Sequence, residues 1–197
     1  MDDKKENTKI QIEKDSLMGK KGIVVLPSDF QGIDWISKAK ALNLNTIGLH
    51  SGGGPNHDVL KTLDEYASKA FQQKVIDAGL DLEYENHVPN MFLPRTLFNE
   101  HPEYFPLNYM DSSRLIEGNW CISNPEVREL ILTNAMNLAD ILKPSTNRHY
   151  FWSADYSGGW CHCSDCSKLT AMEQNLKSIN LIASKMRSVN PKAEIAY

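Results

Sequence analysis

The 197-residue sequence predicts an α/β protein of the (β/α)8 TIM-barrel type, of which the chain covers about strands 1–5. Short apolar runs typical of buried parallel strands alternate with longer segments in which apolar residues recur at helical spacing. Four strand–helix units follow one another, and a fifth strand-like run comes after them. A complete barrel of this type has about 250 residues, so we expect the full gene product to be longer.

The first two units are expected over residues 21–79. Residues 22–27 form an apolar strand, 33–44 a helix, and 45–50 a second strand. The glycines of 51–55 exclude a regular element there and indicate a loop. A single helix is then expected over 60–78, because six residues share one face and Gly79 suits its C-cap: Leu63, Tyr66, Ala67, Ala70, Phe71 and Val75.

The third unit contains an unusually long connection. Its strand is expected over 80–88, and the segment 89–122 that follows has aromatic residues and prolines but no clean period. Connections of this length inside compact domains are usually functional. The next helix is expected over 123–143, with Ser123 and Glu126 as a capping box.

The fourth unit comprises a strand over 149–154, a loop over 155–166 and a helix over 167–189, before a fifth strand over 193–197. Five strands do not close a barrel, so both sheet edges lack a partner. We expect these edges to pair with further strands of the same protein or with another chain, as in a homo-oligomer.

Composition narrows the classes of partner. The net charge is -4 and no basic cluster is present, which argues against a nucleic-acid partner. No apolar run is long enough to span a membrane. The glycines of 51–54 lack the P-loop lysine and the dinucleotide spacing, so no organic cofactor is predicted.

Residues 1–20 are expected to be a disordered leader. That polar leader suits a cytosolic start or the tether of an exported surface lipoprotein, and the compartment stays open.

Several motifs together resemble one protein family. They are His87, Leu93-Pro94-Arg95, His101-Pro102-Glu103-Tyr104-Phe105, Asn119-Trp120-Cys121-Ile122-Ser123-Asn124-Pro125-Glu126-Val127, Trp152-Ser153-Ala154-Asp155, Trp160-Cys161-His162-Cys163-Ser164-Asp165-Cys166 and Asn180. As a set they resemble the bacterial domain-of-unknown-function family 4838, over about residues 22–197. The resemblance implies a glycoside-hydrolase-like barrel, related in fold to α-glucuronidases and β-hexosaminidases, with an oligosaccharide or polysaccharide as partner.

The resemblance makes Asp155 the candidate catalytic residue. Glycosidic cleavage needs one carboxyl group to protonate the leaving oxygen, and in these relatives an acid at the end of strand four does so. Hexosaminidases have an adjacent Asp-Glu pair there, whereas this chain has Asp155-Tyr156. Substrate-assisted chemistry is therefore not expected. A second carboxylate would come from Glu83, Glu85 or strands outside the chain. The alternative is that Asp155 only caps a turn.

Candidate sugar-binding residues follow from their places at strand ends, where barrel active sites lie. Strand alternation puts Glu83, Glu85 and His87 on one face of the third strand. His50 ends the second strand, and Trp152 and Trp160 offer flat faces for a pyranose ring. We expect His50, Glu85, His87, Trp152 and Trp160 to bind substrate, with ordinary packing as the alternative.

All four cysteines lie in or beside the two expected loops after strands three and four: Cys121, Cys161, Cys163 and Cys166. Neighbouring loops can bring four thiolates together in a closed, structural zinc site. Two disulfides or four free thiols are the alternatives. For the whole protein we favour a glycoside hydrolase, with a glycan-binding barrel without catalysis as the alternative. This chain by itself is expected to be a fragment that is inactive without the remaining strands.

Overall fold

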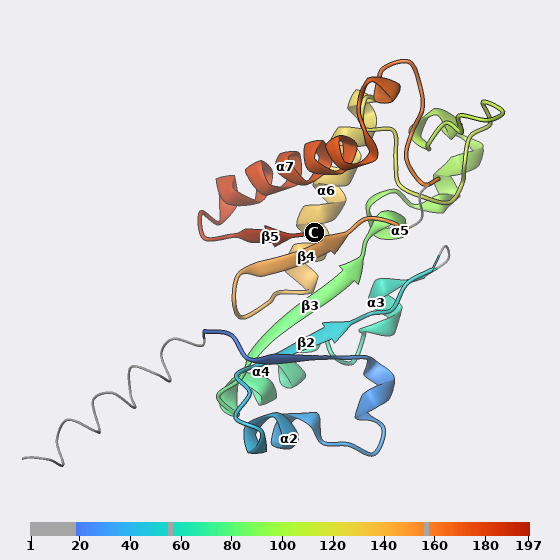
Figure 1. The fold of residues 1–197 in the computed structure, drawn as a ribbon. Coiled ribbons are helices and arrows are strands. Elements are labelled where there is room, and N and C mark those ends of the chain that lie inside the picture. Colours follow the sequence, from blue (N-terminus) through green and yellow to red (C-terminus); the bar gives the residue numbers. More distant parts are fainter. Residues whose placement is uncertain (1–18, 55–56, 156–157) are drawn as a thin grey trace, which may run out of the picture.

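A computed structural model describes residues 19–54, 57–155 and 158–197, and its centre is a parallel five-stranded sheet (Figure 1). The strands lie side by side in chain order: β1 (Gly22–Val25), β2 (Thr46–His50), β3 (Asp81–His87), β4 (Arg148–Trp152) and β5 (Glu194–Ala196). All neighbouring pairs are parallel. The five expected strands are therefore confirmed, with small differences at their ends.

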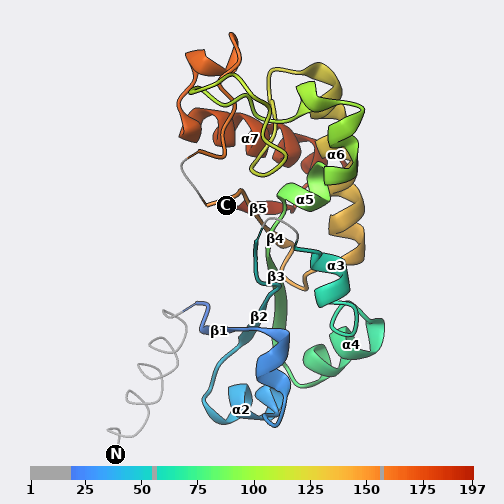
Figure 2. The same cartoon turned by 90° about the vertical axis from the view of Figure 1, so that its right-hand side faces the viewer.

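The helices cover the outer side of this sheet (Figures 1 and 2). They are α2 (Trp35–Ala41), α3 (Val59–Thr62), α4 (Lys69–Asp77), α5 (Pro89–Phe92), α6 (Pro125–Ile141) and α7 (Ala171–Val189). Ile47, Leu49 and Leu82 point from the sheet toward the helices and are fully buried. Such burial contributes about 2 kcal/mol per large aliphatic side chain. This is the arrangement of the first five strands of a (β/α)8 barrel, as predicted.

The prediction of a single helix over 60–78 is wrong. Two separate helices, α3 and α4, lie there, and a polar side chain caps the start of each. The carboxylate of Asp58 accepts a hydrogen bond from the Lys61 N–H and caps α3. The Ser68 hydroxyl accepts one from the Phe71 N–H at 3.2 Å and caps α4. Serine favours caps over helix interiors, so the apolar stripe continues across a break in the backbone.

The starts of the last two helices also differ from prediction. Asn124, rather than Ser123, caps α6, since its Oδ1 accepts hydrogen bonds from Glu126 N and Val127 N. α7 begins at Ala171 rather than at 167. Thr170 and Glu173 form a capping box there, with Glu173 N donating to Thr170 Oγ1 at 3.2 Å.

The long segment 89–122 is folded and well packed. It contains α5, two 3-10 helices, η2 (Arg95–Asn99) and η3 (Pro102–Tyr104), and an antiparallel bridge between Leu107 and Arg114. Its large apolar side chains are buried: Phe92, Leu93, Phe105, Trp120 and Ile122. Figure 1 shows it beyond the carboxyl ends of β3 and β4, where it can wall a site.

The expected leader over 1–20 lies almost wholly outside the described residues, which begin at Gly19. Within the described part of the chain, no helix is long and apolar enough to cross a membrane. β1 and β5 are the edges of the described sheet. Their pairing with further strands or with a second chain stays a prediction.

Candidate active site

Three aromatic rings meet at the carboxyl ends of three neighbouring strands. His50 ends β2, His87 ends β3 and Trp152 ends β4. The ring centroids of His50 and His87 are 5.8 Å apart, and the Trp152 ring lies 5.4 Å from each of them. Alternation along the strands puts all three side chains on the inner face of the sheet, as predicted for His87.

Backbone carbonyls fix the two imidazoles. His50 Nδ1 lies 2.9 Å from the carbonyl oxygen of Glu85, and His87 Nδ1 lies 2.9 Å from that of Ser153. A carbonyl oxygen can only accept, so Nδ1 donates in both rings. In a neutral imidazole with a protonated Nδ1, Nε2 is the acceptor. Each histidine therefore keeps Nε2 available for a proton from another group.

Asp155 supplies such a group beside His87. It follows β4, its carboxylate is 82% exposed, and Oδ2 lies 3.5 Å from His87 Nε2. Gly53 packs against the other side of the imidazole, where an added Cβ would lie 3.2 Å from His87 Cδ2. His87 is thus held between a glycine-rich loop and an acid that is open to solvent.

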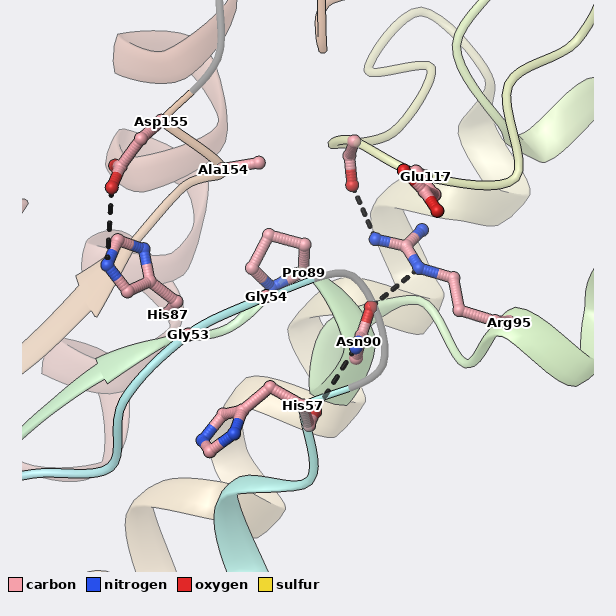
Figure 3. A pocket seen from close by; sticks show the side chains of 11 residues that line it. Gly53, Gly54, His57, His87, Pro89, Asn90, Arg95, Glu117, Ala154 and Asp155 are labelled. Atoms are coloured by element: carbon pink, nitrogen blue, oxygen red, sulfur yellow. Dashed lines mark hydrogen bonds and ion pairs between the residues drawn. The ribbon is translucent and has the colours of Figure 1, made fainter.

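A pocket of about 340 Å³ lies next to this pair (Figure 3). This volume falls in the range of about 300–1,000 Å³ that small-molecule sites occupy. The residues that line it are Gly53, Gly54, His57, His87, Pro89, Asn90, Arg95, Glu117, Gly118, Ala154 and Asp155. Figure 3 shows His87 and Asp155 on one side of the pocket and Arg95 and Glu117 on the other.

The far wall is a chain of polar contacts that sequence reasoning did not identify. Asn90 Nδ2 donates to the His57 carbonyl at 3.1 Å, and Arg95 Nε donates to Asn90 Oδ1 at 2.7 Å. Arg95 also donates to the carbonyl of Gly118, and its guanidinium lies over the Phe105 ring. The length of segment 89–122 indicated a functional connection, but no periodicity marked which residues face the pocket.

His57 belongs to the same pocket and was also missed. Its Nε2 is buried without a hydrogen-bond partner among the described residues. Burial lowers the pKa of this imidazole and outweighs the opposing effect of the Asp58 carboxylate. The neutral form of His57 is therefore favoured at the pocket wall.

Two carboxylates on β3 have different surroundings. Glu85 is half-buried beside His50, and burial raises its pKa. Its Oε1 lies over Gly48, where an added Cβ would be 2.9 Å away. Glu83 lies toward the amino ends of the strands and accepts hydrogen bonds from Lys20, Thr146 and Tyr150. Those bonds engage Glu83 within the fold, and Glu83 does not line the pocket.

The two predicted tryptophans are placed differently. Trp152 is partly exposed and its ring contacts both site histidines, although Trp152, like His50 and Glu85, is not among the residues that line the pocket. Trp160 is 8% exposed and does not line the pocket, so its ring has no free face toward it. His50, Glu85, His87, Trp152 and Asp155 thus gather at one end of the sheet, whereas Trp160 lies apart.

All four cysteine sulfurs converge, as the sequence predicted. The Sγ atoms of Cys121, Cys161, Cys163 and Cys166 all lie within 4.8 Å of one another. Cys121 Sγ is 3.6 Å from Cys163 Sγ and 3.9 Å from Cys166 Sγ. A disulfide needs about 2.05 Å, and all four thiols are free. The cluster could bind a metal ion.

Polar groups surround these sulfurs. The hydroxyl of Ser123 lies 3.2 Å from the sulfurs of Cys121 and Cys163, and Leu107 N–H donates to Cys161 Sγ at 3.4 Å. Hydrogen bonds from the thiols of Cys161 and Cys166 lower the pKa of Cys121. His162 is exposed, and its ring contacts that of Tyr109.

The sequence matches the family described as "Domain of unknown function (DUF4838)" over residues 53–197. The chain therefore belongs to this family, and the resemblance of its motifs is confirmed. No curated protein matches the sequence.

Solved glycosidases share the fold. An α-galactosidase from Lactobacillus brevis is 11% identical with a TM-score of 0.56, and the match covers 89% of this chain and 26% of that one. The galactosidase domain of an α-galactosidase–sucrose kinase is also 11% identical, with a TM-score of 0.55 and coverages of 91% and 27%. The chain thus spans about a quarter of these proteins, which fits a partial barrel.

Proposed function

We propose that this chain carries part of a glycoside-hydrolase-like active site that acts on an oligosaccharide or polysaccharide, with Asp155 as general acid. One observation carries the proposal: the exposed carboxylate of Asp155 lies at the carboxyl end of β4, beside His87 and a pocket of about 340 Å³. Active sites of (β/α)8 barrels lie at this end. The solved α-galactosidases of the same fold support the choice of carbohydrate.

In this role Asp155 delivers a proton to the leaving glycosidic oxygen. After departure of the leaving group Asp155 is a carboxylate, and the water that attacks the sugar gives up the proton that restores the acid. His87 Nε2, the basic atom next to the carboxyl group, can accept that proton and pass it to Asp155. A second carboxylate must act on the opposite side of the sugar. Glu117 lines the pocket across from Asp155, and Glu85 lies beside His50. The remaining strands of a complete barrel are the other source.

The surrounding groups suit a sugar. The Trp152 ring offers an apolar face, and the Nε2 atoms of His50 and His87 can bond hydroxyl groups. Asn90 and Arg95 add amide and guanidinium groups on the far wall. A mostly apolar pocket with a few convergent polar groups is the usual form of a small-ligand site.

The second candidate function is glycan binding without cleavage. It is favoured by the small number of acids: among the described residues, Asp155 and Glu117 are the carboxylates that line the pocket. A barrel that retains the aromatic and polar walls but lacks a working carboxylate pair would hold a glycan intact.

The experiment begins with a thermal-shift screen of the protein against neutral sugars, uronic acids and N-acetylhexosamines, because a ligand stabilises the folded state even when uncleaved. Release of 4-nitrophenol from the corresponding aryl glycosides then measures turnover. Asp155→Asn is expected to abolish turnover and keep binding. Asp140→Asn, the same change on the exposed face of α6, is the control and should alter neither. Binding by wild type without any turnover would favour the second candidate.

We also propose that the four cysteines hold a structural zinc ion. Four Zn–S bonds of about 2.3 Å in a tetrahedron give sulfur–sulfur edges of about 3.8 Å. The separations of 3.6 and 3.9 Å at Cys121 are close to this edge length, and all four sulfurs lie within 4.8 Å of one another. Ser123 and the Leu107 N–H add the outer hydrogen bonds that thiolate ligands usually receive. With four protein ligands no position stays open for substrate, so the ion would not be catalytic.

Metal analysis of protein purified without chelator tests the zinc proposal. One zinc per chain, with four thiols that react only after chelation, is the expected result. Two disulfides, or four reactive thiols with no metal, would contradict it. Cys161→Ser should lose the ion, and Ser164→Ala, an exposed change in the same loop, should keep it.

A further inference from the structure

Asn119, Trp120 and Cys121 are consecutive, and each contacts a different part of the chain that follows β4. Asn119 bonds the beginning of the β4–α7 loop, Trp120 bonds α7, and Cys121 contacts the cysteines near the loop's end. Asp155 lies in this loop. One short segment of the β3–α6 connection therefore braces the loop that carries the proposed acid.

Asn119 makes the contact nearest to Asp155. It is fully buried, its Oδ1 accepts a hydrogen bond from Ala154 N–H at 2.8 Å, and its own N–H donates to the Gly159 carbonyl at 2.8 Å. The first bond fixes the peptide unit directly before Asp155. Because the position of a side chain follows from its backbone, Asn119 acts on the carboxylate of Asp155 without touching it.

The amide of Asn119 is not explained by packing alone. Its Nδ2 is buried with no hydrogen-bond partner among the described residues. Burial of an unpaired amide donor is unfavourable, and an aliphatic side chain of similar size would fill the space without that cost. The useful part of the side chain is therefore Oδ1, the acceptor for Ala154.

The neighbours of Asn119 tie it to the cysteine cluster. Trp120 is buried, and its Nε1 donates to Ser178 Oγ on α7 at 2.9 Å. On the same helix, Gln174 accepts from Cys161 N–H at 3.2 Å and donates to the Cys161 carbonyl at 3.0 Å. The segment that contains Asn119 is thus linked to the cysteine cluster twice, directly through Cys121 and indirectly through Trp120, α7 and Cys161.

We propose that Asn119 is a positioning residue for Asp155, and that the metal ion held by Cys121 and its three partner cysteines keeps Asn119 in place. The inference rests on the proposed function of Asp155 and of the cluster. A misplacement of about 1 Å at a reacting group can lower a rate by about 100-fold. Loss of the ion would therefore impair the active site through the Asn119–Ala154 hydrogen bond, although the ion touches no substrate.

Amide hydrogen exchange measures this bond directly and needs no substrate. Asn119→Leu removes the acceptor, and Asn119→Asp keeps an oxygen at Oδ1. In Asn119→Leu we expect exchange of the Ala154 amide to rise at least about tenfold and turnover to fall about 100-fold, with zinc content unchanged. Asn119→Asp should restore both to within several-fold. The Val88 amide, which donates to the Trp152 carbonyl, is the internal control and should not change.

The role of the ion can be tested without a substitution, by comparing Ala154 amide exchange in wild-type protein with and without a zinc chelator. Chelation should raise Ala154 exchange as Asn119→Leu does and leave Val88 protected. Unchanged Ala154 exchange in Asn119→Leu overturns the role of Asn119, and unchanged exchange after zinc removal overturns the role of the ion. Turnover that survives in Asp155→Asn defeats the proposed acid instead, and the exchange result at Ala154 remains a separate test.

Discussion

Glu83 and Asp155 are carboxylates at opposite ends of the same sheet, and their surroundings differ. Glu83, near the amino ends of the strands, is 2% exposed and accepts hydrogen bonds from three side chains. Asp155, at the carboxyl end of β4, is 82% exposed, and its Oδ2 lies 3.5 Å from His87 Nε2. The bonding capacity of Glu83 is used within the fold, whereas the carboxylate of Asp155 is open to solvent. In characterised (β/α)8 barrels, activity resides at the carboxyl ends of the strands and residues at the amino ends contribute to stability.

The largest effect expected from this contrast is on turnover in Asp155→Asn. Removal of a general acid lowers kcat by about 10³, within the range that proton-transfer groups contribute. Because the side chain is exposed and makes few contacts, the melting temperature should stay within about 1 °C of wild type. Steady-state kinetics and calorimetry on one preparation check both. A fall in melting temperature of many degrees would make Asp155 a structural residue.

Glu83→Gln should show the opposite pattern. It keeps the size of the side chain but removes the charge that Lys20 neutralises and weakens the bonds from Thr146 and Tyr150. We expect a loss of about 2 kcal/mol in the free energy of unfolding, typical of hydrogen bonds to a buried charge, with kcat within about threefold. Urea unfolding measures the loss. A Glu83→Gln variant that is as stable as wild type but inactive would contradict the structural role of Glu83.

The pH dependence sharpens the same comparison. Burial raises the pKa of Glu83, but hydrogen bonds from Lys20, Thr146 and Tyr150 outweigh it, so the pKa lies below its ordinary value of 4.5. A carboxyl group with a lowered folded pKa stabilises the protein above its unfolded pKa and loses that contribution as pH falls through the folded value. The stability gap between wild type and Glu83→Gln should therefore narrow below about pH 4.5. Unfolding titrations between pH 7 and pH 3 check it, and a gap that widens on acidification would be inconsistent.

The smallest effect is expected for Trp152→Phe. Phenylalanine keeps a ring against His50 and His87 but presents less surface to a sugar. Affinity for the sugar found in the screen should fall about threefold, equivalent to about 0.7 kcal/mol. Calorimetric titration measures the change. An unaltered affinity would mean that Trp152 only packs the site histidines.

Strand-end residues were predictable because a period of two fixes the face of each side chain. This placed Glu85 and His87 together. Asp155 followed from its position after the fourth strand together with the family resemblance. The far wall was not predictable, since Asn90, Arg95 and Glu117 come from a segment whose turns follow tertiary contacts rather than a repeat. The N-cap of α6 was predicted wrongly because the hydroxyl of Ser123 could serve either as a helix cap or as a neighbour of the cysteines. Ser123 is a good cap by sequence, but its hydroxyl lies among the cysteine sulfurs while Asn124 caps the helix.

The order of the sheet has a consequence for synthesis on the ribosome. Each strand from β2 onward pairs with the strand made just before it, so the sheet can grow one unit at a time as the chain emerges. The cysteine cluster cannot form in this stepwise order. Cys121 must wait for Cys166, which is 45 residues later and beyond β4, before the four sulfurs can meet. The braces around Asp155 are therefore completed late, after the sheet beneath them has formed.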